Sequence, residues 1–178
     1  MTSPSSVAVP GIPGGLVQPH VLRSIMRQHS AGVAVITTRA EGPVGFCATS
    51  LSSVSLEPPA ICFAVATDSV SGQAWRSAVH GIVHLLRSDQ AAVASEFARS
   101  GPDKFAGTVG WRWGPCGQPL LDNVLAWMLV RPYIRLVVGD HLLVICYVRE
   151  AIVEPRTEPG PGPLIHHDGG FHCLPPIS

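Results

Sequence analysis

Short runs of β-branched and apolar residues, separated by turn residues, recur along most of the chain. Runs of this kind, bounded by Gly, Pro, Asp and Ser, are typical of strands. The 60–66 run is apolar throughout, which predicts a strand covered on both faces. Gly139 and Asp140 predict a two-residue hairpin turn, because Gly tolerates a positive φ at the first turn position. The predicted strands are 32–38, 44–51, 60–66, 81–86, 125–138, 141–153 and 164–174.

Three other segments carry helical signals. Apolar residues at helical spacing, with a proline in the first turn, predict a helix over 19–29. A short helix is expected over 71–78 and another over 88–98, where Ser88 is a suitable N-cap. The segment 108–121 is rich in Gly, Trp and Pro, and we predict a loop with aromatic anchors there. The whole pattern predicts a mainly β fold with a few helices, of the small barrel kind.

Composition supports this class and narrows the function. Of 178 residues, 46% are apolar and 13% are charged, so the chain can bury a sizeable core. The 17 Pro and 18 Gly disfavour a helical bundle. Lys and Arg balance Asp and Glu at twelve each, so we expect neither nucleic-acid binding nor a polybasic membrane-surface protein. No apolar stretch is long enough to predict a membrane span.

The start of the chain differs from the rest. Residues 1–18 are rich in Ser, Pro and Gly and predict a flexible N-terminal arm, or an arm that packs on a partner subunit. A single domain is expected over 19–178. The arm lacks the basic and continuous apolar regions of a signal peptide. The five cysteines contain no CxxC pair, and we expect reduced thiols in a cytoplasmic protein.

Two hydroxyl-rich segments are candidates for binding a polar ligand. The tract over 49–55 could present several hydroxyls on one face of a strand, or it could be a plain Ser/Thr-rich edge strand. Residues 68–72 precede a predicted helix, and free amides with hydroxyls at a helix start can bind an anion. The alternative for 68–72 is an ordinary N-cap.

Two further candidates are a cation and a histidine. Lys104 beside Phe105 could pair with a phosphate, or it could be a solvated Lys next to a core Phe. His141 at the mouth of the hairpin is placed to meet a ligand, or it is a surface residue next to a turn. Metal binding is not expected, because the adjacent His166 and His167 point to opposite faces of a strand.

Taken in order, these segments resemble the flavin reductase-like family, the split-barrel, FMN-binding reductase components of two-component flavin monooxygenases. The resemblance covers about 20–174 and rests on an ordered set of motifs more than on any single one. The matching segments are 31–38, 45–59, 83–86 with Gln90 and Phe97, 103–107, 138–141 and 162–164.

The resemblance implies a six-stranded split barrel that works as a homodimer and binds flavin near the subunit interface. The isoalloxazine ring would be held by Cys47, Ala48, Thr49 and Ser50 and flanked by Ala64 and Val65. The phosphate would be bound by Ser69 and Ser71 with Lys104, next to Phe105. The ribityl side would be lined by His84 and Leu85, with Gln90 and Phe97 nearby. His141 would face the nicotinamide.

The resemblance also implies an activity, the transfer of a hydride from NADH or NADPH to FMN or FAD. Reduced flavin would then diffuse to a partner monooxygenase. His141 is expected to position the nicotinamide, because hydride transfer to flavin needs no protein acid or base. Two alternatives remain open on the residues alone. One is an enzyme that keeps its flavin and acts directly on a pathway intermediate, and the other is a non-catalytic flavin- or haem-binding module on the same barrel.

Overall fold

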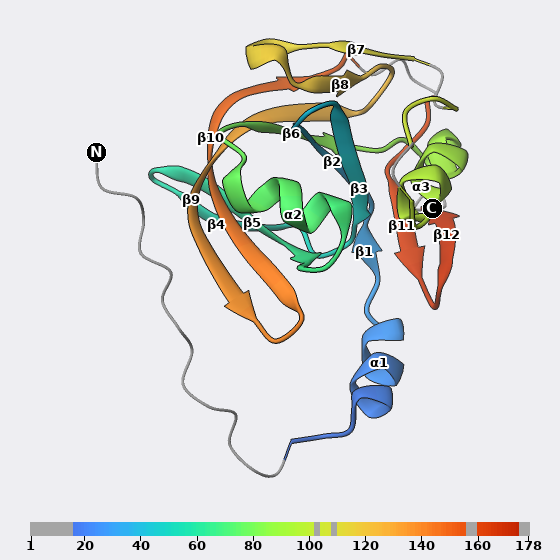
Figure 1. Cartoon of the computed structure of the whole chain (residues 1–178). Coiled ribbons are helices and arrows are strands. Elements are labelled where there is room, and N and C mark those ends of the chain that lie inside the picture. The colour runs from blue at the N-terminus through green and yellow to red at the C-terminus, as the bar shows by residue number, and fades with distance from the viewer. Residues whose placement is uncertain (1–15, 102–103, 108–109, 156–159, 175–178) are drawn as a thin grey trace.

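One curled antiparallel sheet of seven strands organises the protein, one strand more than the six that the resemblance implies. The computed structural model describes residues 16–101, 104–107, 110–155 and 160–174, so residues 1–15 of the predicted arm lie outside the described part. Hydrogen-bonded neighbours follow the order β3-β2-β6-β9-β10-β5-β4, and within the described residues the edges β3 and β4 are not paired with each other. The sheet is therefore an open, split barrel, and the predicted fold class is confirmed (Figure 1). The strands are β2 (Ala34–Arg39), β3 (Pro43–Ala48), β4 (Ser52–Leu56), β5 (Pro59–Ala66), β6 (Gly81–Leu85), β9 (Ala126–Val138) and β10 (His141–Val153).

The strand predictions agree with the sheet, except for the end of the predicted strand over 44–51 and for one face of the predicted strand over 60–66. The predicted strand over 44–51 ends at Ala48, and a separate strand follows. In β5 buried and half-buried residues alternate from Ile61 onward, with Phe63 fully buried and Ala64 half-buried. The expected cover on both faces of 60–66 was wrong, because in β5 the alternate side chains are half-buried and Ala64 and Ala66 line a surface cavity. The turn at Gly139 and Asp140 is confirmed, with φ of +59° at Gly139.

Three helices accompany the sheet: α1 (Pro19–Arg27), α2 (Val70–Ser77) and α3 (Ala91–Ala98). All three were predicted, but the start of the third was wrong. A 3-10 turn, η1 (Ser88–Gln90), precedes α3, and Gln90 occupies the N-cap position of α3 without a capping bond from its side chain to that helix. The Ser88 hydroxyl therefore does not cap α3. None of the helices in the described part of the chain is long and apolar enough to cross a membrane.

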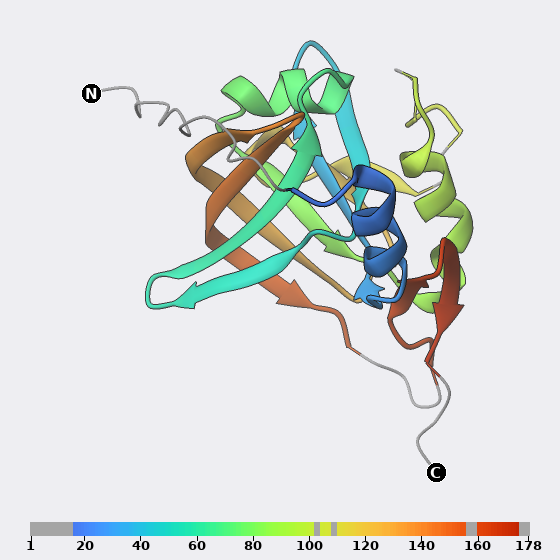
Figure 2. The same cartoon turned by 90° about the horizontal axis from the view of Figure 1, so that it is seen from below.

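Two small sheets lie beside the main one and correct two other predictions. The segment 108–121, predicted as a loop, contains the paired strands β7 (Trp111–Trp113) and β8 (Pro119–Leu121) joined by η2 (Pro115–Gly117), while 108–109 lie outside the described residues. The last predicted strand is a hairpin of β11 (Leu164–His167) and β12 (Gly170–Cys173), and β11 also pairs with β1 (Ala31–Gly32). This hairpin lies beside α3 in both views (Figure 1, Figure 2).

Two apolar clusters hold the fold on the two faces of the sheet. Inside the curl, α2 closes one end of the barrel (Figure 1, Figure 2) and contributes Trp75, which is fully buried and meets Phe63 edge-on at 4.8 Å between ring centroids. The Arg135 guanidinium on β9 donates from Nε to the Trp75 carbonyl oxygen at 2.8 Å, which ties α2 to the long hairpin. On the outer face, Phe97 of α3 packs on Phe105 at 5.0 Å. Core residues thus hold α2 and α3 against the two faces of the sheet.

Candidate functional site

A surface cavity of about 600 Å³ lies where β3, the end of β5, the start of α2 and the end of α3 meet. Its volume lies within the range of about 300–1,000 Å³ that is usual for cofactor sites. The predicted site residues that line it are Cys47, Ala64, Val65, Ser69, Ser71, Phe97, Lys104 and His141. These residues come from five separate segments of the sequence, and the fold brings them together.

The start of α2 supplies amide groups to this cavity. The Ser69 hydroxyl accepts a hydrogen bond from the Gly72 N–H at 2.9 Å and donates to the Ala66 carbonyl at 2.8 Å, so it caps the helix. The first intrahelical bond is donated by Gln73 to the Ser69 carbonyl, so the N–H groups of Val70 and Ser71 have no partner within the helix and point out of its start. A Cβ atom on Gly72 would lie 1.9 Å from the Ala66 oxygen, so glycine permits this close approach of helix and strand. The arrangement suits an anionic group.

The hydroxyl of Ser71 does not point to a ligand. It is buried and donates to the Gly45 carbonyl at 3.1 Å, which links α2 to β3. Only the backbone of Ser71 remains available for the predicted phosphate contact. A Cβ atom on Gly45 would lie 2.6 Å from the Phe97 ring, so this glycine lets α3 pack against the strand.

Cationic groups lie at the α3 side of the cavity. The Lys104 ammonium donates to the Phe97 carbonyl at 2.9 Å, and burial lowers the pKa of Lys104 from its usual value. Burial also raises the pKa of the Cys47 thiol to about 11, although the nearby Lys104 opposes the change. The thiol is therefore neutral at physiological pH. Arg99, the C-cap of α3, lines the same cavity and forms an ion pair with Glu96.

The tip of the β9–β10 hairpin forms another wall. The Asp140 carbonyl accepts hydrogen bonds from both the N–H and the hydroxyl of Thr67, each at 3.0 Å. This pair of bonds fixes the hairpin tip to the end of β5. The His141 ring lines the cavity, and its Nδ1 lies 2.7 Å from the Asp140 carboxylate, whose pKa is lowered by the hydrogen bond from His141.

Ala48, Thr49 and Ser50 follow Cys47 in the sequence, but they are not among the residues that line the cavity. Thr49 and Ser50 are exposed after the end of β3, and the preceding Ala48 is buried. The Ser50 hydroxyl accepts from the Ala64 N–H at 3.0 Å and donates to the Ala64 carbonyl at 3.2 Å. The tract is thereby fixed to Ala64, which lines the cavity, and Thr49 is exposed.

His84 is not brought to this site. Its side chain is fully buried, Nδ1 donates to the Val35 carbonyl at 2.9 Å, and Nε2 accepts from the Leu121 N–H at 3.1 Å. Burial lowers the pKa of His84 to about 4, so the ring is neutral. Both ring nitrogens are satisfied by the protein backbone, and the predicted contact of His84 with a ribityl chain is therefore corrected to a core role.

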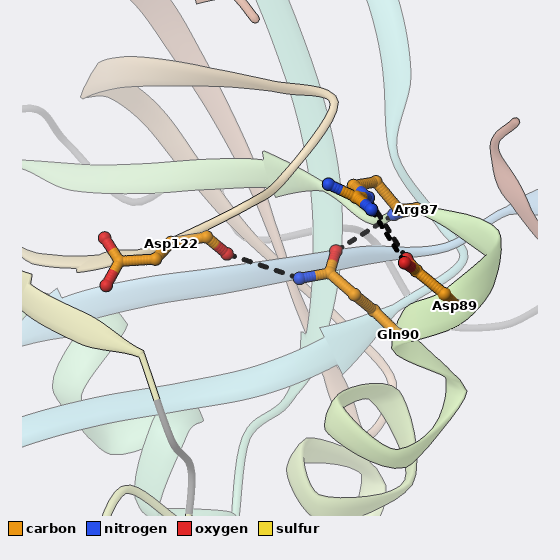
Figure 3. Close-up of polar contacts among 4 residues, drawn as sticks. All are labelled: Arg87, Asp89, Gln90 and Asp122. Carbon is orange, nitrogen blue, oxygen red and sulfur yellow. Dashed lines mark hydrogen bonds and ion pairs between the residues drawn. The ribbon is translucent and has the colours of Figure 1, made fainter. Parts of the chain in front are cut away.

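Leu85, Gln90 and Phe105 also lie outside the cavity lining. The Gln90 amide joins the Arg87 N–H, at 3.0 Å, to the Asp122 carbonyl, at 3.3 Å, and so connects η1 to the loop after β8 (Figure 3). Leu85 packs against the barrel core, and Phe105 is buried against Phe97. Phe105 therefore acts on the cavity only through Phe97.

Several lining residues were missed by the sequence interpretation. Arg99 carried the detectable signal of a cation directly after a predicted helix, whereas Gly45 had no signal, because its role depends on the approach of α3. Asp68 was included in the 68–72 segment and also lines the cavity. Among the described residues, no group of three or more His, Cys, Asp or Glu side chains could hold a metal ion.

The geometry combines an apolar wall with two polar ends. Ala64, Val65 and Phe97 can contact a flat apolar ring, while the α2 amides and Lys104 can bind an anionic tail. The donor set therefore fits a phosphorylated ring compound such as FMN, with His141 placed at the hairpin side.

Comparison with known proteins gives a consistent result. Residues 26–175 match the flavin reductase-like domain family. The chain is 40% identical over 157 residues to an "NADH:FMN oxidoreductase" of Rhodococcus erythropolis, covering 88% of this chain and 82% of that protein. It is 33% identical over 167 residues to the "Flavin-dependent monooxygenase, reductase subunit HsaB" of Mycobacterium tuberculosis, covering 90% of this chain and 84% of that protein.

Solved structures share the fold over nearly their whole length. A flavin reductase domain protein from Arthrobacter superposes with a TM-score of 0.81 at 33% identity, covering 89% of this chain and 97% of the other. The NADH:FAD oxidoreductase SgcE6 of Streptomyces globisporus, solved with NAD and FAD fragments, gives a TM-score of 0.81 at 29% identity, covering 92% and 98%.

Proposed function

Because this chain belongs to the flavin reductase-like domain family, we propose that it is an NADH-dependent flavin reductase that supplies reduced flavin to a partner monooxygenase. The relatives named as NADH:FMN oxidoreductase and as reductase subunits of flavin-dependent monooxygenases support both parts of this proposal. The predicted activity and cofactors agree with these relatives.

One observation in the structure carries the proposal. The 600 Å³ cavity places an anion-binding helix start and Lys104 at one side, and His141 at another, around half-buried apolar residues of β5. This arrangement gives FMN, or the FMN half of FAD, a site for both its phosphate and its ring. It also leaves the hairpin tip free to meet a second ligand.

The residues of the chain bind and orient, and the flavin, when bound, supplies the hydride-accepting chemistry. The α2 amides and Lys104 hold the phosphate, which fixes the ring against Ala64 and Val65. Thr49 and the nearby backbone amides can donate hydrogen bonds to the polar edge of the ring, where negative charge develops on reduction. His141, which lines the same cavity, would position the nicotinamide beside the flavin ring, as close placement of the two reacting groups is what hydride transfer requires.

The test is NADH oxidation by the purified protein with increasing FMN or FAD. We expect a rate that rises with added flavin and then saturates, because free flavin is a substrate of a reductase that serves a separate oxygenase. A tightly bound yellow cofactor with slow NADH turnover would favour the alternative of a flavoenzyme acting on its own substrate. Flavin binding without turnover would favour a non-catalytic module. Parallel assays with NADPH determine the preferred donor.

The phosphate contact can be tested by comparing ligands. Lys104→Gln removes the cation, and we expect FMN to bind roughly ten times more weakly because a charge-assisted hydrogen bond is lost. Riboflavin, which has no phosphate, should bind equally well to the variant and to the wild type. Equal weakening for both ligands would show that Lys104 supports the pocket without binding phosphate.

We also propose that the protein is a homodimer, which is supported by exposed apolar residues. Helix α1 has no buried residue, and it stands apart from the barrel beyond β1 (Figure 1). Its apolar side chains Leu22 and Ile25 are 53% and 60% exposed, and Leu56 at the tip of the β4–β5 hairpin is 84% exposed (Figure 2). Apolar groups left in water this way are typical of an interface.

Sedimentation measurements test the dimer. Leu22→Glu with Ile25→Glu should shift the protein toward the monomer, whereas Arg23→Glu on the polar side of α1 should not. A monomeric wild type at micromolar concentration would refute the dimer without affecting the proposed reaction. The five cysteines form no disulfide, which supports the cytoplasmic location that we propose.

A further inference from the structure

We propose that Asp140 is a positioning residue that keeps the ring proton of singly protonated His141 on Nδ1, so that Nε2 accepts a hydrogen bond from the carboxamide NH₂ group of the nicotinamide. The proposal rests on the proposed function for the identity of the ligand. The tautomer itself depends only on residues of this chain and can be tested without flavin or NADH.

The contact between the two residues determines where the ring proton lies. His141 Nδ1 is 2.7 Å from an oxygen of the Asp140 carboxylate. The hydrogen bond to His141 lowers the pKa of Asp140, so the carboxylate is ionised at neutral pH and can only accept. The proton must therefore be on Nδ1. In a neutral ring the other nitrogen, Nε2, then carries a lone pair and no proton.

The hairpin tip holds this pair in place. Thr67 donates two hydrogen bonds to the Asp140 carbonyl, and Gly139 adopts the positive φ of +59° that the turn requires. The Asp140 side chain is 92% exposed, so its carboxylate contributes little to the fold. Replacing the carboxylate leaves both Thr67 bonds intact, because these are made to the Asp140 backbone.

The tautomer decides what His141 can recognise. A ring protonated on Nε2 would donate to a carbonyl, whereas a bare Nε2 requires an N–H donor. A nicotinamide offers such a donor in its carboxamide NH₂ group. His141 is thereby assigned to select dinucleotides that carry an amide or thioamide, and to disfavour analogues in which a methyl or an oxygen replaces the NH₂ group.

The tautomer is measured by two-bond ¹H–¹⁵N correlation spectra of the full chain labelled with ¹⁵N-histidine. Spectra are taken in alkaline buffer, above the usual titration range of imidazole. The His141 signals are assigned by their loss in His141→Gln. We expect the Nδ1–H pattern in the wild type and a shift toward Nε2–H in Asp140→Ala. Asp89→Ala, an exposed aspartate that pairs with Arg87 outside the cavity, is the matched control and should leave the pattern unchanged. An Nε2–H pattern in the wild type would overturn the proposal.

Ligand recognition is measured by competition of oxidised analogues against NADH, because inhibition constants avoid differences in hydride transfer. The acetylpyridine analogue lacks the NH₂ group and should bind the wild type about three- to tenfold more weakly than NAD⁺, the loss of one hydrogen bond. The thionicotinamide analogue keeps the NH₂ group and should bind like NAD⁺. In His141→Ala and in Asp140→Ala the difference between acetylpyridine and NAD⁺ should become smaller.

The outcomes separate this inference from the proposed function. If the wild type oxidises NADH but does not distinguish the acetylpyridine analogue, the role of His141 as an acceptor is refuted while the reductase activity stands. If the wild type shows the Nδ1–H tautomer but does not oxidise NADH with any flavin, the proposed function fails and the Asp140–His141 pair is retained as a feature of the fold. A KM for NADH unchanged in Asp140→Ala would refute its positioning role.

Discussion

The buried His84 predicts a specific loss of stability in mild acid. Its ring is fully enclosed and bonded to Val35 and Leu121, and burial lowers its pKa to about 4 in the folded protein. In the unfolded chain an imidazole titrates near about 6.5. As the pH falls, the unfolded state therefore binds the proton first. The stability that His84 provides is fully present above about pH 6.5 and is lost progressively between about 6.5 and 4.

The size of the effect follows from the difference between the two pKa values. Between about pH 7.5 and about pH 5, this one group should lower the free energy of unfolding by about 2 kcal/mol. Urea unfolding followed by tryptophan fluorescence, at constant protein concentration, measures this quantity at both pH values. His84→Gln cannot titrate, so its stability should change by about 2 kcal/mol less than that of the wild type over the same interval.

Comparing each protein with itself at two pH values removes the effects of the substitution that do not depend on pH. His84→Gln will lower stability at every pH, but only the difference between the two pH values enters the test. His29→Gln, at an exposed histidine, is the control and should behave like the wild type. Equal pH dependence in the wild type and His84→Gln would show that the ring is protonated in the folded state, and the reasoning from burial would be wrong.

Two other predictions concern the cavity wall. Gly45→Ala places a Cβ atom 2.6 Å from the Phe97 ring, so we expect a loss of about 1–3 kcal/mol in unfolding free energy and weaker flavin binding. Gly42→Ala, where a Cβ meets nothing within 4 Å, is the control, and equal urea midpoints for the two variants would contradict the close contact. Because burial raises the pKa of Cys47 to about 11, iodoacetamide at neutral pH should alkylate Cys47 far more slowly than the exposed Cys116, as measured by peptide mass spectrometry. Equal rates would show that the Cys47 thiol is accessible and ionised.

The sequence predicted well those elements that depend only on neighbouring residues. The hairpin at Gly139 follows from a two-residue turn between long apolar strands, and both α1 and α2 begin where their sequences indicate. Elements defined by distant partners were predicted less well. The hairpin of β7 and β8 lies in a segment rich in Trp, Gly and Pro, and its Trp111, Leu120 and Leu121 side chains join the apolar cluster on the outer face of the sheet.

The positions of the site residues were also difficult to predict from the sequence, because they depend on distant parts of the chain. Several of the predicted site residues lie in strands, among them Cys47, Ala64, His84 and His141. The face that a strand residue occupies depends on the register of its neighbours. Val35 pairs with His84, and both are buried in the protein interior. Likewise, Ser71 was predicted as a phosphate ligand because it lies at a helix start. Its hydroxyl instead donates a hydrogen bond to the carbonyl of Gly45, which lies in a strand distant in sequence.

Two polar parts of the cavity, the start of α2 and the tip of the β9–β10 hairpin, lie at the ends of elements whose interiors are packed in the core. The start of α2 is held by the close approach of Gly72 to Ala66 and by Trp75 in the barrel, and the hairpin tip is held by Thr67. Groups fixed in this way lose little further freedom when a ligand binds, so a few contacts are enough for a modest, reversible affinity. A reductase that releases its reduced flavin to another protein requires such an affinity. The same anchoring implies that core substitutions near Trp75 will change flavin binding as well as stability.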